Sequence, residues 1–442
     1  MWPKGGGGGA ASNEVEELCC AHRDFGVVDE IAGTAATYCT EAASDVEAAS
    51  TFTRYYSLTT KVTATAVSNF IVDMRLAVIN KPIDDISQDG GQHDPRFRFM
   101  SVKPYCFCAG KQDAAAYVPN VIDSVCTSIK SEQDVPNHEA PSGEIKWTRI
   151  QRKAIVIPRK HDHNPFFQIG VVLNALAMMK VLGWSTADTQ LVHLDAGFPN
   201  AMDAIQKDML SPNFPILEGR DLMGTVVRFD QALFVPFEMT GPMMRHLNDE
   251  EPCGHNAMIT QFRDTIMQRL HVPQQKKDPT SCTVTIISRR PYSGRMISRK
   301  WLTEDEILRR MREEYEQPGV YKHGVCKIQS VDFIDLTMEE QGAGMVNVTW
   351  TRPGTKVIEI FPLSRKRWGY RNLCKYVGCD WQEFRGGKDT GKGGNSSDKT
   401  IEYSEWHPFF DPIFKAMVQQ LEGAASERFL ETEVDHHEDD TR

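Results

Sequence analysis

The sequence has no long uninterrupted apolar run. A membrane-spanning helix needs about 18 or more such residues, and no stretch of that length with suitable flanks occurs. The closest segment, 166–184, is interrupted by Gln168, Asn174 and Lys180, so it predicts a buried helix of an α/β domain. The first twenty residues, with Gly5 to Gly9 in a row, lack the apolar centre of a signal peptide. We therefore expect no anchor or leader in this sequence.

Excess positive charge is also missing. The chain has 50 Lys and Arg against 60 Asp and Glu, a net charge of -10, which argues against nonspecific binding to nucleic acid. Six acids lie close together in residues 431–440, so residues 425–442 are predicted to be an acidic, disordered tail.

The eleven cysteines lack a paired zinc pattern. Cys106-x-Cys108 and the pair Cys374 and Cys379 do not have the two-plus-two spacing of a zinc site, so we expect structural cysteines, some of them in disulfides. No Asp-x-Asp or other ligand cluster has a convincing setting, and no metal is predicted.

Regular patterns begin after Trp147. Residues 1–146 are rich in Ala, Ser, Thr and Asp, and they predict an irregular N-terminal extension. Beyond them, 153–158 predicts a buried strand, 166–182 a helix ending at Gly183, and 191–195 a strand ending in an acid.

A second alternation of strands and helices follows the polar, proline-closed segment 274–279, which predicts a linker. Segments 282–288 and 325–331 predict strands, and the capping box Thr303-x-x-Glu306 predicts a helix start between them. The fold class expected is α/β, with two Rossmann-like domains facing a cleft: an acceptor-side domain over 147–272 and a nucleotide-sugar domain over 273–424.

The turn Gly342-Ala343-Gly344 and the acid Glu359 predict a nucleotide or sugar-nucleotide site. Small residues let backbone N–H groups approach a phosphate, and an acid inside a short apolar strand can hold a ribose hydroxyl. A purely structural turn and an exposed strand acid are the alternatives.

The segment before Gly342 begins like a helix but is too short to contain one. A capping box, Thr337-x-x-Glu340, announces a helix, but Gln341 is followed at once by Gly342. A helix with its return strand needs on the order of 12 or more residues. The sequence therefore indicates that a helix and a strand are missing here.

In order, these elements resemble glycosyltransferase family 61, which includes plant-type β-1,2-xylosyltransferases and protein O-linked N-acetylglucosaminyltransferases. The resemblance covers roughly residues 147 to 420. The matching pieces are Asn164-Pro165-Phe166-Phe167, Leu191 to Asp195, Val227-Arg228-Phe229, Phe234-Val235-Pro236, Ser288-Arg289-Arg290, Arg295-Met296-Ile297, Thr303-Glu304-Asp305-Glu306, Met338-Glu339-Glu340-Gln341, Gly342-Ala343-Gly344, Pro353-Gly354-Thr355 and Val357-Ile358-Glu359-Ile360.

The resemblance implies the two-domain arrangement called GT-B, a UDP-sugar donor and transfer with inversion at the anomeric carbon. It also implies work in the lumen of the Golgi or endoplasmic reticulum, usually behind an N-terminal membrane anchor, which this sequence does not show. The family places a helix, a strand and a histidine directly before Gly-Ala-Gly, where this chain has Gln341. A deletion from splicing or gene modelling explains that departure, and it would impair folding and activity.

Inverting transfer needs a base for the acceptor hydroxyl and positive groups for the departing diphosphate. Asp195, His163 and Asp162 are the candidate bases, with Asp195 preferred; a turn start for Asp195 and a capping or structural role for the other two are the alternatives. The diphosphate candidates are Arg289, Arg290 and Arg295, which could instead form a solvated basic loop.

The leading hypothesis is an inverting glycosyltransferase that moves a sugar, with xylose favoured, from a UDP-sugar to a glycan or glycoprotein hydroxyl. No cofactor is expected beyond this donor substrate. The alternative is a catalytically inactive relative that binds a glycan or a protein. An NAD-dependent oxidoreductase is a third hypothesis, weakened because no Gly-x-Gly-x-x-Gly follows a strand.

Overall fold

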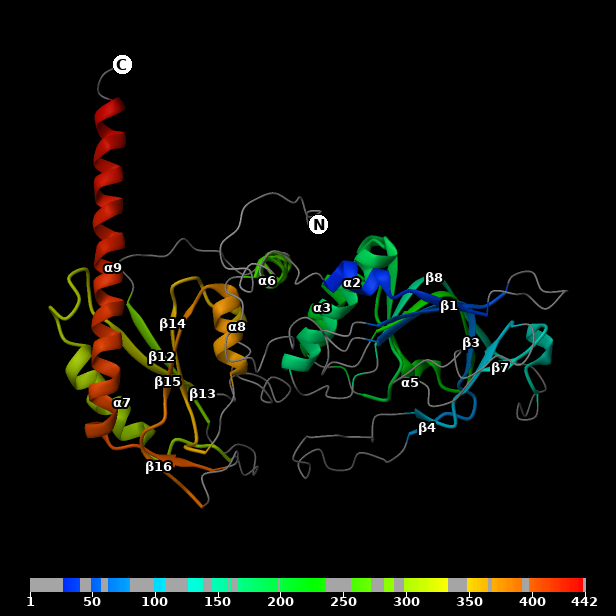
Figure 1. Ribbon diagram of the computed structural model, residues 1–442, viewed down its shortest axis with the longest axis horizontal. Helices are drawn as coiled ribbons and strands as arrows, with labels where there is room; N and C mark the ends of the chain where they lie inside the picture. Colours follow the sequence, from blue (N-terminus) through cyan, green and yellow to red (C-terminus); the bar gives the residue numbers. More distant parts are fainter. Residues whose placement is uncertain are drawn as a thin grey trace. The chain divides into compact units, whose positions relative to one another are not determined.

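The computed structural model describes residues 27–39, 49–56, 63–79, 99–108, 126–137, 145–157, 159, 165–197, 199, 201–235, 256–271, 282–289, 298–332, 348–364, 368–391 and 397–439. The chain divides into two compact units, Met1–His271 and Val272–Arg442 (Figure 1). The predicted linker 274–279 lies outside the described residues.

Unit 1 is built on a nine-stranded mixed sheet in the order β1-β2-β3-β11-β8-β9-β10; off this path, β6 pairs with β3, and β7 pairs with β6. Strands β11, β8, β9 and β10 run parallel to one another, and β3 pairs antiparallel with β11. The strands are β1 (Ala36–Tyr38), β2 (Thr51–Tyr56), β3 (Thr63–Asp73), β6 (Lys103–Cys106), β7 (Thr127–Ser128), β8 (Trp147–Ile157), β9 (Thr189–His193), β10 (Leu217–Glu218) and β11 (Val226–Phe234). The α/β class is confirmed, with a mixed sheet.

The prediction of an irregular extension before Trp147 is wrong. Strand β3 pairs with β11 from Asp73 opposite Val226 to Thr65 opposite Phe234. Phe70 is fully buried and meets Phe52 and Phe234 edge to face, with ring centroids 5.6 and 5.8 Å apart. The Ala, Ser and Thr residues of β3 give a weak strand pattern, and its pairing with β11 determines the conformation.

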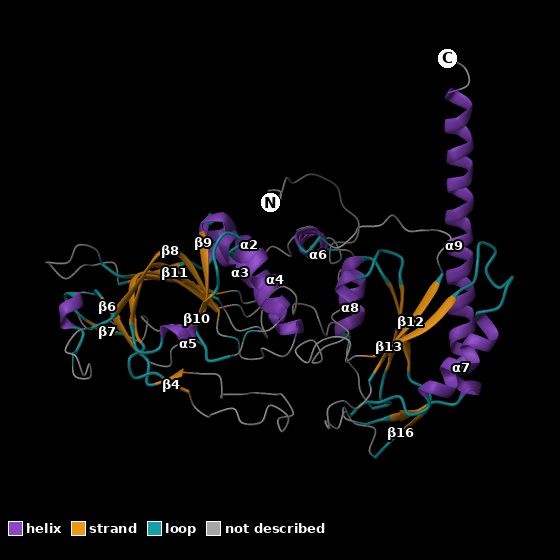
Figure 2. Ribbon diagram, turned by 180° about the vertical axis from the view of Figure 1, so that it is seen from behind, coloured by secondary structure: helices purple, strands orange, loops and turns teal. Residues whose placement is uncertain are grey.

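Helices α2 (Val27–Gly33), α3 (Pro165–Leu182) and α4 (Ala201–Leu210) lie together beside β9 (Figure 2). The predicted helix ending at Gly183 is confirmed, and this glycine has φ +65°, the left-handed value typical of a residue after a helix end. Unit 1 also contains the short pieces β4 (Val78–Ile79), β5 (Phe99–Met100), η4 (Glu132–Asp134), η5 (Thr186–Asp188), α5 (Gly219–Leu222) and helix α6 (Ala257–Arg269).

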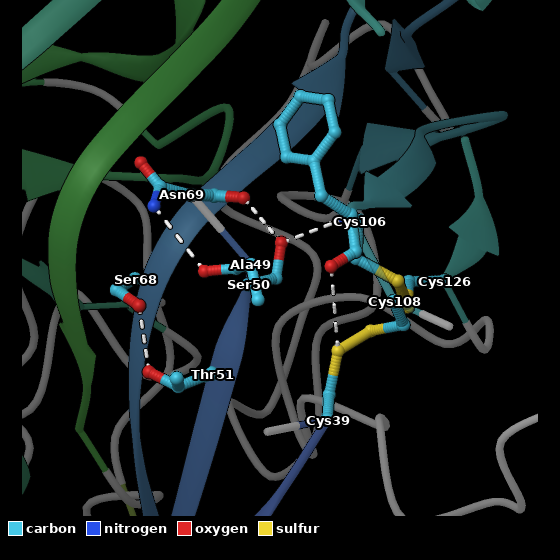
Figure 3. The surroundings of a disulfide bond; sticks show 10 residues. Cys39, Ala49, Ser50, Thr51, Ser68, Asn69, Cys106, Cys108 and Cys126 are labelled. Carbon is cyan, nitrogen blue, oxygen red and sulfur yellow. Dashed lines mark hydrogen bonds between the residues drawn. A yellow bond between two sulfur atoms is a disulfide. The ribbon is translucent and has the colours of Figure 1, made fainter. Parts of the chain in front are cut away.

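Two disulfides crosslink the strands formed by the N-terminal part of the chain (Figure 3). Cys39–Cys108 joins the ends of β1 and β6, and Cys106–Cys126 joins β6 to the start of β7. Beside them the Ser50 hydroxyl donates to the carbonyl of Asn69 and accepts from the backbone N–H of Phe107 at 2.8 Å. The expectation that some cysteines form disulfides is confirmed.

Unit 2 contains two separate parallel strand pairs, β12 (Thr283–Ser288) with β13 (Lys327–Asp332) and β14 (Lys356–Ile360) with β15 (Asp380–Phe384). The described residues of unit 2 also form a short antiparallel pair, β16 (Lys388–Asp389) with β17 (Lys399–Thr400). Ile286, Ile328, Ile358 and Phe384 enter one hydrophobic cluster, although no ladder joins the two parallel pairs within the described residues. This arrangement does not show a continuous Rossmann-like sheet.

Among its described residues, unit 2 has the helices α7 (Glu304–Tyr315), α8 (Gly369–Val377) and α9 (Tyr403–Asp439). Helix α7 begins where predicted, but Thr303 makes no side-chain cap; its hydroxyl instead donates to the carbonyl of Ile401 at 2.7 Å. The prediction of a disordered tail from residue 425 is also wrong, because α9 runs to Asp439 and its Glu, Ala and Leu content favours helix. No helix in the described part of the chain is long and apolar enough to cross a membrane.

Candidate functional site

The carboxyl ends of β8, β9 and β10 bring polar residues together. Ile157 lies opposite His193, and His193 lies opposite Glu218, so the three strands end in one row. Arg159 and Asp195 follow just beyond this row. Open α/β sheets bind ligands at such edges, which makes this edge the candidate site of unit 1.

Arg159 is the centre of the group. Its side chain is fully buried and donates to Asp195 at 3.0 Å, to Asp203 at 3.1 Å and to Glu218 at 3.2 Å. Burial alone would lower the pKa of this guanidinium, but the three carboxylates raise it above its ordinary value. Arg159 is therefore a fixed positive charge that holds three acids from different elements.

The carboxylate of Asp195 is fully engaged. It accepts from the backbone N–H of Arg159 at 2.7 Å, from the Arg159 guanidinium, and from the backbone N–H of Gly197 at 2.7 Å. The bond from Gly197 closes a turn in which the Asp195 side chain accepts from the backbone two residues later. This geometry favours the alternative role for Asp195, a residue that starts a turn and positions Arg159, over that of a base.

His193 connects Glu218 to the side-chain amide of Gln206. Its Nε2 lies 2.8 Å from the Gln206 side-chain oxygen and its Nδ1 lies 3.3 Å from Glu218. Gln206 in turn donates to Gln168 of α3. The Glu218 side chain is 20% exposed, against 4% for Asp195 and 10% for Asp203, so Glu218 is the acid that solvent reaches most easily.

A close backbone approach shapes the same edge. A Cβ on Gly219 would lie 2.5 Å from the carbonyl oxygen of Asp195 and 2.8 Å from that of His193. No side chain fits at such distances. The glycine therefore lets the chain after β10 pass directly against the end of β9.

Glu218 predicts a pH dependence of stability. Burial raises its pKa, but the hydrogen bond to His193 and the charge of Arg159 outweigh burial and lower the pKa below its ordinary value. A carboxylate with a depressed native pKa stabilises the fold above its unfolded pKa of about 4.3, and that stabilisation is lost as pH falls through the native pKa.

Glu218→Gln should therefore weaken the fall of unit 1 stability at acid pH. Backbone hydrogen exchange of β9 and β10, measured from pH 7 down to pH 3 in steps and corrected for intrinsic rates, reads this effect. The control is Asp221→Asn, at an exposed position on neighbouring α5. An equal acid slope in the parent chain and Glu218→Gln would contradict the assignment.

In unit 2, Arg289 directly follows β12 and is half-buried. Glu359 lies on β14, and its carboxylate accepts a hydrogen bond from the indole of Trp381 on β15 at 3.1 Å. The remaining predicted site residues lie outside the described part of the chain; they are Asp162, His163, Arg290, Arg295, Gly342, Ala343 and Gly344. Whether these residues come together in one donor site stays a prediction.

The sequence reasoning missed Arg159, His193, Asp203 and Glu218. Arg159 lies in a basic stretch that is typical of solvated surface, and β10 is too short to show a period. One usable signal was His193, a polar residue inside the otherwise apolar run before Asp195.

Comparison of the chain with models of known protein families gives no match, and neither does comparison with curated protein sequences.

Proposed function

We propose that this chain is a glycosyltransferase that moves a sugar from a UDP-sugar to a hydroxyl of a glycan or glycoprotein, with inversion. The observation that carries the proposal is the order of the motifs from Asn164 to Glu359, which resembles family 61. The α/β units, with polar residues at the carboxyl ends of parallel strands, support it.

The reaction makes one bond and breaks one. The acceptor oxygen attacks the anomeric carbon, the bond from that carbon to the diphosphate oxygen breaks, and the hydroxyl proton passes to a protein base. Arg289, with Arg290 and Arg295, is proposed to stabilise the leaving diphosphate, and Glu359 with the Gly342 turn is proposed to hold the nucleotide. We extend this to two facing domains of the GT-B type.

The base is proposed among Asp162 and His163, which follow Arg159 closely in the chain. Asp195 is already held by Arg159 and two backbone N–H groups, so it is the weakest of the three as a proton acceptor. Its proposed role is to fix the segment that leads to Asp162 and His163.

The proposed compartment is the lumen of the Golgi or endoplasmic reticulum. The described residues contain four disulfides, in both units. Disulfides persist in oxidising compartments and are rare in the cytosol.

A donor assay tests the activity. The full chain is incubated with UDP-xylose or UDP-N-acetylglucosamine and a mixture of glycoprotein acceptors, and UDP release and labelled product are measured. Transfer is expected from UDP-xylose, and it should be lost in Asp162→Asn or His163→Ala while UDP binding persists. Transfer from UDP-N-acetylglucosamine alone would overturn the choice of xylose.

A second function has its own support. Its support is the short chain before Gly342, where the family places a helix, a strand and a histidine and this chain has Gln341. We propose as the alternative an inactive relative that binds a glycan or a protein. Acceptor binding without any UDP release in the donor assay would favour it.

A further inference from the structure

Helices α7 and α9 of unit 2 bring together a histidine and two carboxylates that the proposed transfer reaction does not use. His407 and Asp411 lie one turn apart on α9, and Glu314 lies near the end of α7. One possible ligand atom from each residue lies within 4.8 Å of the other two. Residues four apart on a helix share a face, which is why both α9 side chains reach Glu314.

Aromatic residues hold these side chains in place. The His407 ring stacks on Tyr315, with ring centroids 6.4 Å apart and 18° between the planes, and it also lies 5.6 Å from the ring of Tyr403. The Tyr403 hydroxyl donates to Glu314, and the Tyr315 hydroxyl donates to Asp411 at 3.3 Å. Each carboxylate thus has a hydroxyl that orients it, the kind of support that outer-shell groups give to metal ligands.

We propose that Glu314, His407 and Asp411 bind a zinc ion that ties α7 to α9. Imidazole together with carboxylate oxygen suits zinc, whereas magnesium and calcium favour oxygen ligands alone. Three protein ligands leave the fourth tetrahedral position to water.

The geometry needs only a small adjustment. His407 Nε2 now lies 2.7 Å from a Glu314 oxygen. Zinc bonds of about 2.0–2.1 Å at tetrahedral angles separate two ligand atoms by about 3.4 Å. The two side chains must therefore part by less than an ångström. Asp411 also contacts Lys415 at 2.7 Å, but that lysine side chain is 68% exposed and can turn toward water.

The charge balance also favours a cation. Glu314 and Asp411 carry two negative charges; His407 contacts Glu314 at 2.7 Å, and Lys415 contacts Asp411 at 2.7 Å. A zinc ion would compensate the remaining charge and bridge two helices through three bonds. In a metal-free protein the same side chains form a hydrogen-bonded surface cluster, and the experiment must separate these two cases.

The test is zinc titration of the full chain by calorimetry in metal-free buffer. Because His436 and His437 could also bind zinc, the titrated protein carries His436→Gln and His437→Gln. One zinc per chain is expected. Binding should be lost in His407→Ala and should weaken about tenfold in Tyr403→Phe, which removes the hydroxyl that orients Glu314. His271→Asn, at an exposed histidine of unit 1, should bind as the parent protein does.

Folding is controlled within the same set of variants. Glu314→Gln keeps the size of the side chain and can still hydrogen-bond Tyr403, so it should fold normally and bind zinc at least tenfold more weakly. Circular dichroism without metal verifies the fold of each variant. Absence of stoichiometric zinc binding by the parent protein, or undiminished binding by His407→Ala, would overturn the proposal.

Discussion

Arg159→Met should destabilise unit 1 by about 3–5 kcal/mol, the usual result of removing one partner from a buried ionic group. The guanidinium contacts Asp195, Asp203 and Glu218, and its side chain is 0% exposed. Without it, three carboxylates repel one another where water cannot solvate them fully. Methionine fills a similar length with no charge, so the loss is electrostatic rather than a cavity effect.

Hydrogen exchange by mass spectrometry of β8 and β9 measures this effect in unit 1 alone. That choice matters because a chain with two units need not unfold in one step. The matched control is Arg149→Met, which breaks an ion pair with Asp230 at 2.9 Å whose arginine is 52% exposed. An exposed pair of this kind contributes about 0–1 kcal/mol. Equal effects from the two variants would show that Arg159 does not hold the group together.

Replacing Cys282 and Cys326 together by alanine should destabilise unit 2 by about 4 kcal/mol, from the loop-closure entropy of a crosslink with this spacing. The bond joins residues 44 apart in sequence, directly before β12 and β13. It therefore fixes the start of both strands of one parallel pair. Without it the unfolded chain gains freedom, and the two-stranded ladder must form unaided.

The second disulfide of unit 2 is the control. Cys374 and Cys379 are only 5 apart, so the double alanine variant should lose about 2 kcal/mol by the same relation. Hydrogen exchange of β12, β13 and β15 in oxidised protein compares the two variants. A loss for Cys374 and Cys379 equal to or larger than that for Cys282 and Cys326 would contradict the role assigned to the longer crosslink.

The sequence predicts the strongly patterned elements. Segment 153–158 corresponds to the end of β8, and the apolar run before Gly183 corresponds to α3, because long apolar runs with clear stop signals are locally determined. Thr303 correctly predicts the start of helix α7, but not as a helix cap. Its hydroxyl instead donates to the carbonyl of Ile401, which is remote in sequence. Strand β3 is missed since its pattern is weak and β11 determines its place.

The candidate site is less predictable than the fold. Asp195 is found as a strand-end acid, but its partner Arg159 and the acids Asp203 and Glu218 come from separate elements. Their meeting depends on the order of β8, β9 and β10 in the sheet, which no local pattern contains. Burial of an arginine among three acids is thus a property of the tertiary structure.

The two parallel strand pairs of unit 2 pack in one hydrophobic cluster but form separate sheets within the described residues. Ile286 of β12 and Ile358 of β14 share a hydrophobic cluster, yet no backbone ladder links their strands within the described residues. The family resemblance leads us to expect another strand before Gly342. The residues on both sides of that point lie outside the described part of the chain, so the loss of this strand stays a prediction.

Titration of the full chain with UDP tests the proposed donor class most directly. We expect binding with a dissociation constant in the micromolar range, about −8 kcal/mol at 1 μM. Arg289→Ala should weaken it at least tenfold, while Arg352→Ala, at an exposed position elsewhere in unit 2, should leave it unchanged. No binding at millimolar UDP, or equal binding by Arg289→Ala and the parent chain, would contradict the account.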